Sequence, residues 1–179
     1  MIINSEDAEK EAFLCAAKLM VAAARTAPKA GGRDSIKTMI LTGEDKDRLA
    51  DAMSTTGRTG ETNPKNVRDA GAVVLIGVDF GSNTDEWFGM KAKLIDLGIA
   101  LGSAVKVASD LNIDNRIFYS AGRAAIQAGI MKADEVQGIP IAIKGKNIFF
   151  DRIRPNIQPE GRSIEETAIA TMSGSHSDA

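Results

Sequence analysis

One segment limits the possible folds of this chain more than any other: residues 91–112, which read KAKLIDLGIALGSAVKVASDLN. Apolar side chains recur there at spacings of three and four, which predicts a helix of about six turns. Further apolar side chains extend around most of its circumference, so the helix needs cover on more than one side. A chain of 179 residues can hardly provide all of it, and the sequence therefore predicts a central helix that a second copy of the protein helps to cover.

Two glycines on this helix, Gly98 and Gly102, are four residues apart and therefore lie on one face. Each costs about 1 kcal/mol relative to alanine in a helix interior, so we expect something to pack closely against the backbone there. Another helix of the same chain is the simplest candidate. A flat cofactor ring and the dimer partner are the alternatives.

The segments around this helix predict both strands and further helices. Residues 70–78, AGAVVLIGV, form a continuous apolar run, which is typical of a strand covered on both faces. This mixture of predicted helices and strands indicates a single α+β domain. The other expected elements are a strand over 35–42, a helix over 42–53, an exposed loop over 54–64, a helix of small residues over 119–131, a turn over 132–138, and two strands around a turn at Gly145.

The first helix is predicted to end in a basic loop. Its apolar positions place it over residues 5–27, Asn4 or Ser5 can cap it, and Pro28 ends it. The loop that follows, PKAGGRD, combines a glycine turn with cations, and a phosphate group needs backbone amides and fixed cations. Each basic residue alone is more simply a solvated surface charge. As a group they form a candidate anion site, together with two residues that follow the central helix: Arg25, Lys29, Gly31, Gly32, Arg33, Asn115 and Arg116.

Charge and the few reactive residues exclude several classes of function. With 22 basic and 24 acidic residues, the net charge of −2 lacks the basic excess expected of a nucleic-acid-binding protein. The single cysteine, Cys15, and the single histidine, His176 in the polar tail, provide neither a metal or iron–sulfur site nor a Ser-His-Asp triad. Glycine-rich nucleotide fingerprints of the GxGxxG or GxxxxGK type do not occur.

The N-terminal sequence predicts a cytoplasmic protein. The residues MIINSEDAEKEAF contain no cationic stretch followed by an apolar one, so a secretory signal is not expected. The apolar run near 97–108 contains two glycines, a serine and a lysine, and is shorter than the roughly 20 residues that span a bilayer. A reducing compartment also suits a chain with one free cysteine.

Three stretches of the chain resemble the nitroreductase fold, a dimeric flavin-binding α+β family. They are residues 23–53, AARTAPKAGGRDSIKTMILTGEDKDRLADAM, residues 66–78, NVRDAGAVVLIGV, and residues 94–114, LIDLGIALGSAVKVASDLNID. The chain is also similar, over most of residues 5–152, to a family of short bacterial and archaeal proteins labelled as ferredoxin-domain-containing. The phrases VAAARTAPKAGG, DLGIALGSAVKVASDLNIDNRI and GIPIAIKGKNIFFDR carry that likeness.

The resemblance implies a nitroreductase-like α+β fold, with a central antiparallel or mixed sheet flanked by helices around a long buried central helix. It also implies a homodimer. The C-terminal residues hold two prolines and end in small polar side chains, which predicts an arm or flexible tail over 154–179 after a domain over residues 1–153. The flavin FMN would be the cofactor, held by the basic loop and by Asn115 and Arg116. No iron–sulfur cluster and no metal are expected.

The chain departs from its relatives at the places where they hold cofactors. Short relatives carry a cysteine-rich insertion after the core strand, whereas this chain has DFGSNTDEWFGM there. Nitroreductases begin with an arginine-rich segment, for which this chain has only MIIN. They also offer a serine and an asparagine to the flavin in the Ala-Pro loop, and the matching residues here are Lys29 and Gly32.

Two functions remain open at this stage. The first is an FMN-dependent oxidoreductase of the nitroreductase type, in which the flavin ring itself carries the hydride chemistry and no side chain is required as acid or base. The second is a non-catalytic relative that keeps the dimeric scaffold for binding or regulation.

Overall fold

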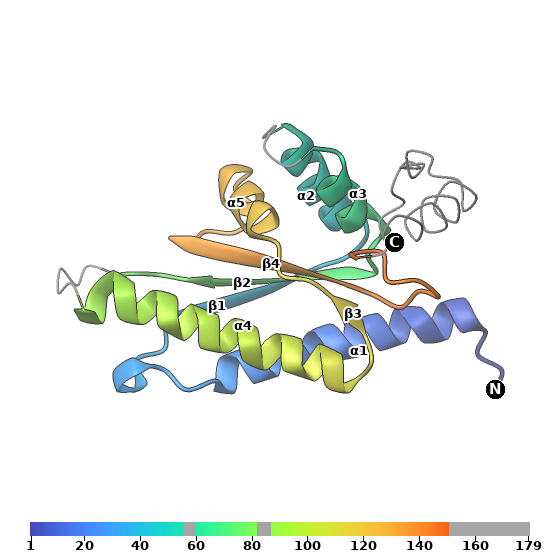
Figure 1. The fold of residues 1–179 in the computed structure, drawn as a ribbon. Coiled ribbons are helices and arrows are strands. Elements are labelled where there is room, and N and C mark those ends of the chain that lie inside the picture. Colours follow the sequence, from blue (N-terminus) through green and yellow to red (C-terminus); the bar gives the residue numbers. More distant parts are fainter. Residues whose placement is uncertain (56–59, 82–86, 151–179) are drawn as a thin grey trace, which may run out of the picture.

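A four-stranded antiparallel sheet lies between two layers of helices (Figure 1). The computed structural model describes residues 1–55, 60–81 and 87–150. The strand order is β1-β2-β4-β3, with β1 at Ile36–Leu41, β2 at Ala72–Val78, β3 at Asp114–Asn115 and β4 at Glu135–Ala142. Helices α1 (Ser5–Thr26) and α4 (Ala92–Asp110) cover one face. Helices α2 (Gly43–Thr55), α3 (Thr62–Asp69) and α5 (Tyr119–Gln127) cover the other.

The ends of α1 are set by local chemistry, as the sequence predicts. The Asn4 side chain accepts a hydrogen bond from the Asp7 backbone N–H over 2.9 Å and caps the first turn. Glu6 and Asp7 place negative charge at the positive end of the helix dipole. At the other end, Ala27 has left helical geometry, with φ of −54° and ψ of 139°, immediately before Pro28.

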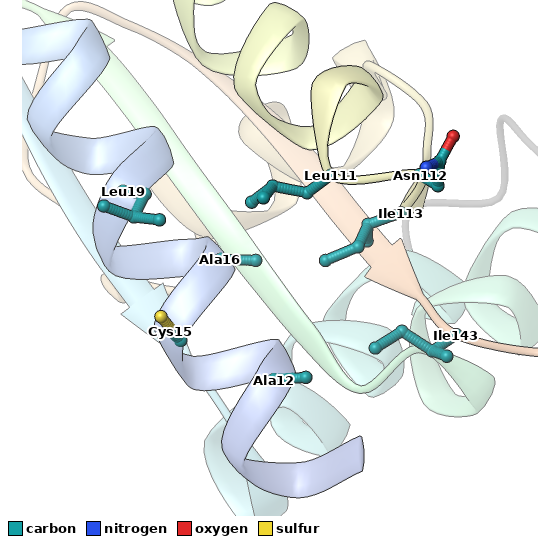
Figure 2. Close-up of a pocket in the computed structure, with 8 residues that line it drawn as sticks. All are labelled: Ala12, Cys15, Ala16, Leu19, Leu111, Asn112, Ile113 and Ile143. Atoms are coloured by element: carbon teal, nitrogen blue, oxygen red, sulfur yellow. The ribbon is translucent and has the colours of Figure 1, made fainter. Parts of the chain in front are cut away.

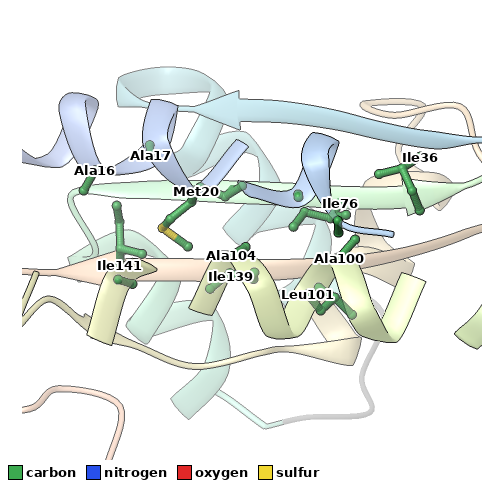
Figure 3. Close-up of a cluster of buried hydrophobic side chains, with 14 of the residues drawn as sticks. Ala16, Ala17, Met20, Ile36, Ile76, Ala100, Leu101, Ala104, Ile139 and Ile141 are labelled. Carbon is green, nitrogen blue, oxygen red and sulfur yellow. The ribbon is translucent and has the colours of Figure 1, made fainter. Parts of the chain in front are cut away.

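Strand β2 is buried along its whole length, which confirms the prediction made from its apolar run. Its side chains alternate between two cores. Ala72, Val74, Ile76 and Val78 face α1 and α4, where they meet residues such as Met20 and Ala104 (Figure 3). Val73 and Leu75 face the other layer and join Leu49, Met53, Phe118 and Phe149.

Helix α5 makes the closest backbone approach to the sheet. A Cβ atom added at Gly122 would lie 1.8 Å from the carbonyl oxygen of Val136 on β4. A Cβ added at Gly138 would lie 2.7 Å from the Cβ of Ala121. Two reciprocal backbone hydrogen bonds between Phe118 and Gly138, of 2.7 and 3.2 Å, fix the start of α5 at the same place. The small residues of this helix therefore allow direct contact between backbones.

Helix α4 is covered on one side by the sheet and α1, while its opposite side is exposed in the single chain. Leu97, Ala100 and Ala104 are buried against the core. Around Gly98 and Gly102, by contrast, a Cβ atom would meet nothing within 4 Å. The expectation that another helix of the same chain packs on these glycines is therefore wrong. The outer side of α4 carries exposed apolar side chains instead, namely Leu94, Ile95 and Ile99.

Other local predictions fail where tertiary contacts decide. The loop expected over 54–64 is interrupted, because α2 continues to Thr55 and α3 begins at Thr62. Only Pro64, Asn66 and Val67 of α3 are buried. The polar composition of this segment therefore did not predict a helix. Proline is tolerated in the first turn of a helix, because its missing N–H would be unpaired there in any case. Residues 56–59 lie outside the described residues.

The C-terminal strands also differ from expectation. The turn expected over 132–138 gives way to β4 from Glu135 onward, because β2 pairs with it along Ala72–Val78. A second strand after Gly145 does not form in the described residues 143–150. Strand β4 already has β2 on one edge and β3 on the other, so it offers that segment no free edge. The arm predicted over 154–179 lies outside the described residues. Among the described helices, none is long and apolar enough to cross a bilayer.

Candidate functional site

The basic loop contains an open turn built on two glycines. Ala30–Gly32 form one turn of 3₁₀ helix, and Gly31 and Gly32 have φ of 61° and 65°, a region that side chains other than glycine rarely adopt. The Gly32 N–H donates to the Lys29 carbonyl oxygen over 3.0 Å. A Cβ at either glycine would meet nothing within 4 Å, so the outer side of the turn is accessible. The predicted glycine turn is present and exposed.

Two of the loop's three predicted cations hold the loop together. The Arg25 guanidinium forms a 2.7 Å ion pair with Asp34 and donates to the Ile36 carbonyl oxygen over 2.5 Å. The Lys29 ammonium donates to the carbonyl oxygens of Arg25 and Ala27, which are left without helical partners at the end of α1. Arg33 is exposed, and the described residues provide no ion pair for it. Arg33 is therefore the cation of this loop that can meet a ligand.

Two charged residues of α4 that the sequence analysis did not select anchor the loop from behind. Asp96 is only 2% exposed, and its Oδ1 accepts a 2.8 Å hydrogen bond from the Ala30 backbone N–H. Lys93 is 9% exposed, and its Nζ donates to the Arg33 carbonyl oxygen over 3.3 Å. Their signal in the sequence was a pair of charges on the same helix face as Leu97 and Ala100, where a core-facing helix is usually apolar.

Asn115 and Arg116 lie at the opposite end of α4 from the basic loop (Figure 1). Helix α4 has 19 residues, which makes it about 29 Å long at about 1.5 Å per residue. The Arg116 guanidinium donates to the Phe149 carbonyl oxygen over 3.1 Å and lies 5.5 and 5.1 Å from the ring centroids of Phe118 and Phe150. Within one chain, the structure does not bring this pair to the loop.

An apolar hollow of about 270 Å³ lies near the same end of α4 (Figure 2). Ala12, Cys15, Ala16 and Leu19 of α1 line one side, and Leu111, Asn112, Ile113 and Ile143 line the other. Cys15 is exposed there as a free thiol. In the described part of the chain, no group of three or more histidine, cysteine, aspartate or glutamate side chains could hold a metal ion.

Comparison with known sequences identifies the family. The family model described as "Uncharacterized protein containing a ferredoxin domain" (DUF2148) matches residues 90–152, which include α4, α5 and β4. An uncharacterised protein of Archaeoglobus fulgidus is 35% identical over 181 residues, covering 85% of this chain and 98% of that protein. The chain belongs to this ferredoxin-domain family.

Comparison with solved structures confirms the fold of this family member. A Desulfovibrio desulfuricans protein described as a nitroreductase in complex with FMN has a TM-score of 0.57 and 15% identity, over 82% of this chain and 78% of that one. NfrA2 of B. megaterium has a TM-score of 0.59 and 12% identity, over 96% of this chain and 72% of that one. Nitroreductase A of Vibrio parahaemolyticus has a TM-score of 0.56 and 13% identity, over 97% of this chain and 75% of that one. This ferredoxin-domain family member therefore has the nitroreductase fold.

The residues of the ferredoxin-domain family member fit an FMN phosphate in part. An open turn at Gly31 and Gly32, with the exposed Arg33 beside it, offers backbone and one cation to an anion. Arg25 and Lys29 add positive charge nearby while holding the loop to α1. Asn115 and Arg116 could take part only if another subunit brought the end of its own α4 to this loop.

Proposed function

We propose that this protein is an FMN-dependent oxidoreductase of the nitroreductase type, with the flavin phosphate at the Gly31–Gly32 turn. The observation that carries the proposal is the open, positively charged turn beside the start of α4, in a chain with the nitroreductase fold. Bound FMN would supply hydride transfer from a reduced nicotinamide to an organic acceptor. The chain itself would bind the phosphate through Arg33 and the turn.

The exposed side of α4 supports the proposal of a homodimer. Leu94, Ile95 and Ile99 are 41%, 54% and 39% exposed, and they surround the bare backbone at Gly98 and Gly102. Small residues between branched ones let two copies of one helix approach closely when a twofold axis relates them. An antiparallel pairing of this kind places the end of one α4 beside the start of the other. The loop of one subunit would then face its partner, and the cofactor would lie at the subunit interface.

The test is to purify the protein and to record its visible absorbance before and after titration with FMN. The proposal expects flavin absorbance or saturable FMN binding, and bleaching of the flavin on addition of NADPH or NADH. Arg33→Glu should weaken binding at least tenfold, because it replaces the exposed cation of the turn by an anion. Arg48→Glu is the matched control, since Arg48 is 63% exposed on α2 on the other face of the sheet. Equal effects of the two variants would contradict a phosphate site at the turn.

A non-catalytic dimeric scaffold is the alternative, and one observation favours it. Arg25, Lys29 and Arg116 all donate to groups of their own chain, so much of the predicted positive charge serves the fold. A colourless protein that does not bind FMN in titration would establish this alternative over the enzyme. The cytoplasmic location expected from the N-terminal sequence stays a prediction in both cases.

A further inference from the structure

The loop region contains both buried side-chain polar atoms that lack a hydrogen-bond partner in the described part of the chain. They are Oδ2 of Asp96 and Oγ of Ser35. Burial of a carboxylate is unfavourable unless hydrogen bonds compensate for its lost hydration. Asp96 is 2% exposed, and within the described residues its carboxylate accepts a single hydrogen bond, from the Ala30 backbone N–H. Such a group persists in a core when it serves something other than packing.

Asp96 and Lys93 hold the glycine turn at its two ends. The Asp96 carboxylate binds the amide of Ala30, the residue before Gly31, and the Lys93 ammonium binds the carbonyl oxygen of Arg33, the residue after Gly32. Two consecutive glycines have more conformational freedom than any other pair of residues. Contacts from α4 therefore help to determine the shape of the turn, in addition to the contacts that Arg25 and Lys29 make within the loop.

We propose that Asp96 is a positioning residue that fixes the Gly31–Gly32 turn in the shape that receives an anionic ligand. This inference rests on the proposed function, which supplies the ligand, the FMN phosphate. Asp96 acts from the inner side of the turn, because its carboxylate is buried and takes the Ala30 amide. A charged acceptor makes this hydrogen bond about twice as strong as a neutral one would. Asp96 itself does not touch the ligand.

A second consequence concerns the outer surface of the same helix. Ile95 comes directly before Asp96 and Ile99 three residues after it, and both lie on the exposed side of α4. One rigid helix therefore carries both the proposed dimer surface and the anchor of the loop. A partner subunit that packs on α4 would contact the element that shapes the turn.

Hydrogen exchange tests the structural half of the inference without any cofactor. Asp96→Ala removes the acceptor, and exchange of the loop amides 30–33 should become roughly tenfold faster, as expected for the loss of a charge-assisted hydrogen bond. Amides of β2 should keep the wild-type rate. Asp96→Asn retains an oxygen acceptor and should restore slow exchange at least partly. Asp110→Asn is the matched control, because Asp110 is an exposed aspartate on the same helix.

Ala30→Pro provides the reverse test, because it removes the N–H donor and leaves Asp96 in place. Lys29 has φ of −130° and ψ of 146°, which a residue before proline readily adopts. If the Asp96–Ala30 hydrogen bond is responsible, the effects of Ala30→Pro and Asp96→Ala on exchange at 31–33 will not add. Additive effects would contradict the inference. Ala30→Pro alone serves if Asp96→Ala does not fold, because it should also make exchange at 31–33 faster than in the wild type.

FMN titration tests the functional half. Asp96→Ala should raise the FMN dissociation constant roughly tenfold, and Asp96→Asn should recover most of that loss. Equal affinity of wild type and Asp96→Ala, or equal loop exchange, would overturn the role of Asp96. Failure of the wild type to bind FMN would instead overturn the proposed function, and the exchange experiment would still decide whether Asp96 shapes the turn.

Discussion

Gly122 on α5 and Gly98 on α4 both lie in helices that pack against the sheet, but their surroundings are opposite. A Cβ at Gly122 would lie 1.8 Å from a backbone oxygen of β4, whereas a Cβ at Gly98 would meet nothing within 4 Å. The first glycine is required by a contact within the chain. The second glycine lowers helix stability, and no contact within the single chain compensates for that loss.

This difference indicates that α5 packs within the subunit, whereas the outer side of α4 is suited to a contact with another molecule. Helix α5 completes its packing inside the subunit, through Gly122 and Gly138. Helix α4 buries one side and leaves Ile95, Ile99 and two bare glycines on the other. We infer that α4 completes its packing against a second copy. Three substitutions test this contrast and a fourth tests an exposed ion pair on α1, in order of decreasing effect.

Gly122→Ala should produce the largest change in stability. The added methyl group would collide with the Val136 carbonyl oxygen, and only separation of α5 from β4 could relieve the contact. We expect the free energy of unfolding to fall by about 3 kcal/mol or more, or the variant to fail to fold. Urea denaturation followed by circular dichroism measures the change. A loss below about 1 kcal/mol would show that α5 is not in direct contact with β4.

Ile99→Lys should dissociate the proposed dimer and leave the subunit folded. Ile99 is 39% exposed in the single chain, so a lysine there can reach water, but in a dimer its charge would be buried. We expect the dimer dissociation constant to rise about 100-fold, close to 2.7 kcal/mol, as measured by sedimentation velocity. Arg48→Met on α2 is the control, because it removes an exposed charge on the other face of the sheet, away from the proposed interface. An unchanged dissociation constant for Ile99→Lys would place the interface elsewhere.

Gly98→Ala should change stability in opposite directions in the two states. In a dissociated subunit the alanine has free space and a better helix propensity, so the free energy of unfolding should rise by up to about 1 kcal/mol. In the dimer the methyl group would separate the two helices and weaken association. Thermal unfolding over a range of protein concentrations distinguishes the two effects. Stabilisation at every concentration would mean that no partner contacts Gly98.

The Glu6–Lys10 pair should give the smallest effect, because both side chains are exposed, 79% and 63%. A hydrogen bond from Lys10, together with its positive charge, lowers the pKa of Glu6 below its ordinary value. A lowered pKa in the folded state stabilises the fold above the ordinary pKa, and this contribution disappears as the pH falls through the lowered value. Lys10→Met should return the pKa of Glu6 toward normal in an NMR titration. No change in that titration would show that the pair does not form.

Sequence alone predicted the features that local chemistry decides. Asn4 and Pro28 mark the ends of α1 because capping and proline geometry act over a few residues. The apolar run of β2 predicted a strand buried on both faces. The strand expected after Gly145 depended on a free edge of β4, and that edge is taken by residues near 114, which no local pattern encodes.

The candidate site could be predicted only where neighbouring residues in the sequence determine it. The glycine turn and Arg33 follow from local sequence, and in the structure both glycines have positive φ and Arg33 is exposed. Asp96 and Lys93 were missed because they reach the loop across 66 and 60 residues of sequence. Asn115 and Arg116 were grouped with the loop by charge alone, although the length of α4 separates them. Charge type is visible in a sequence, whereas distance is set by the fold.

The mass of the purified protein in solution tests the central claim most directly. Sedimentation equilibrium at micromolar concentration should give twice the 18.9 kDa of one chain, and Ile99→Lys should give the mass of one chain. A wild-type protein that sediments as a single chain under these conditions would contradict the pairing of α4 across its exposed glycines.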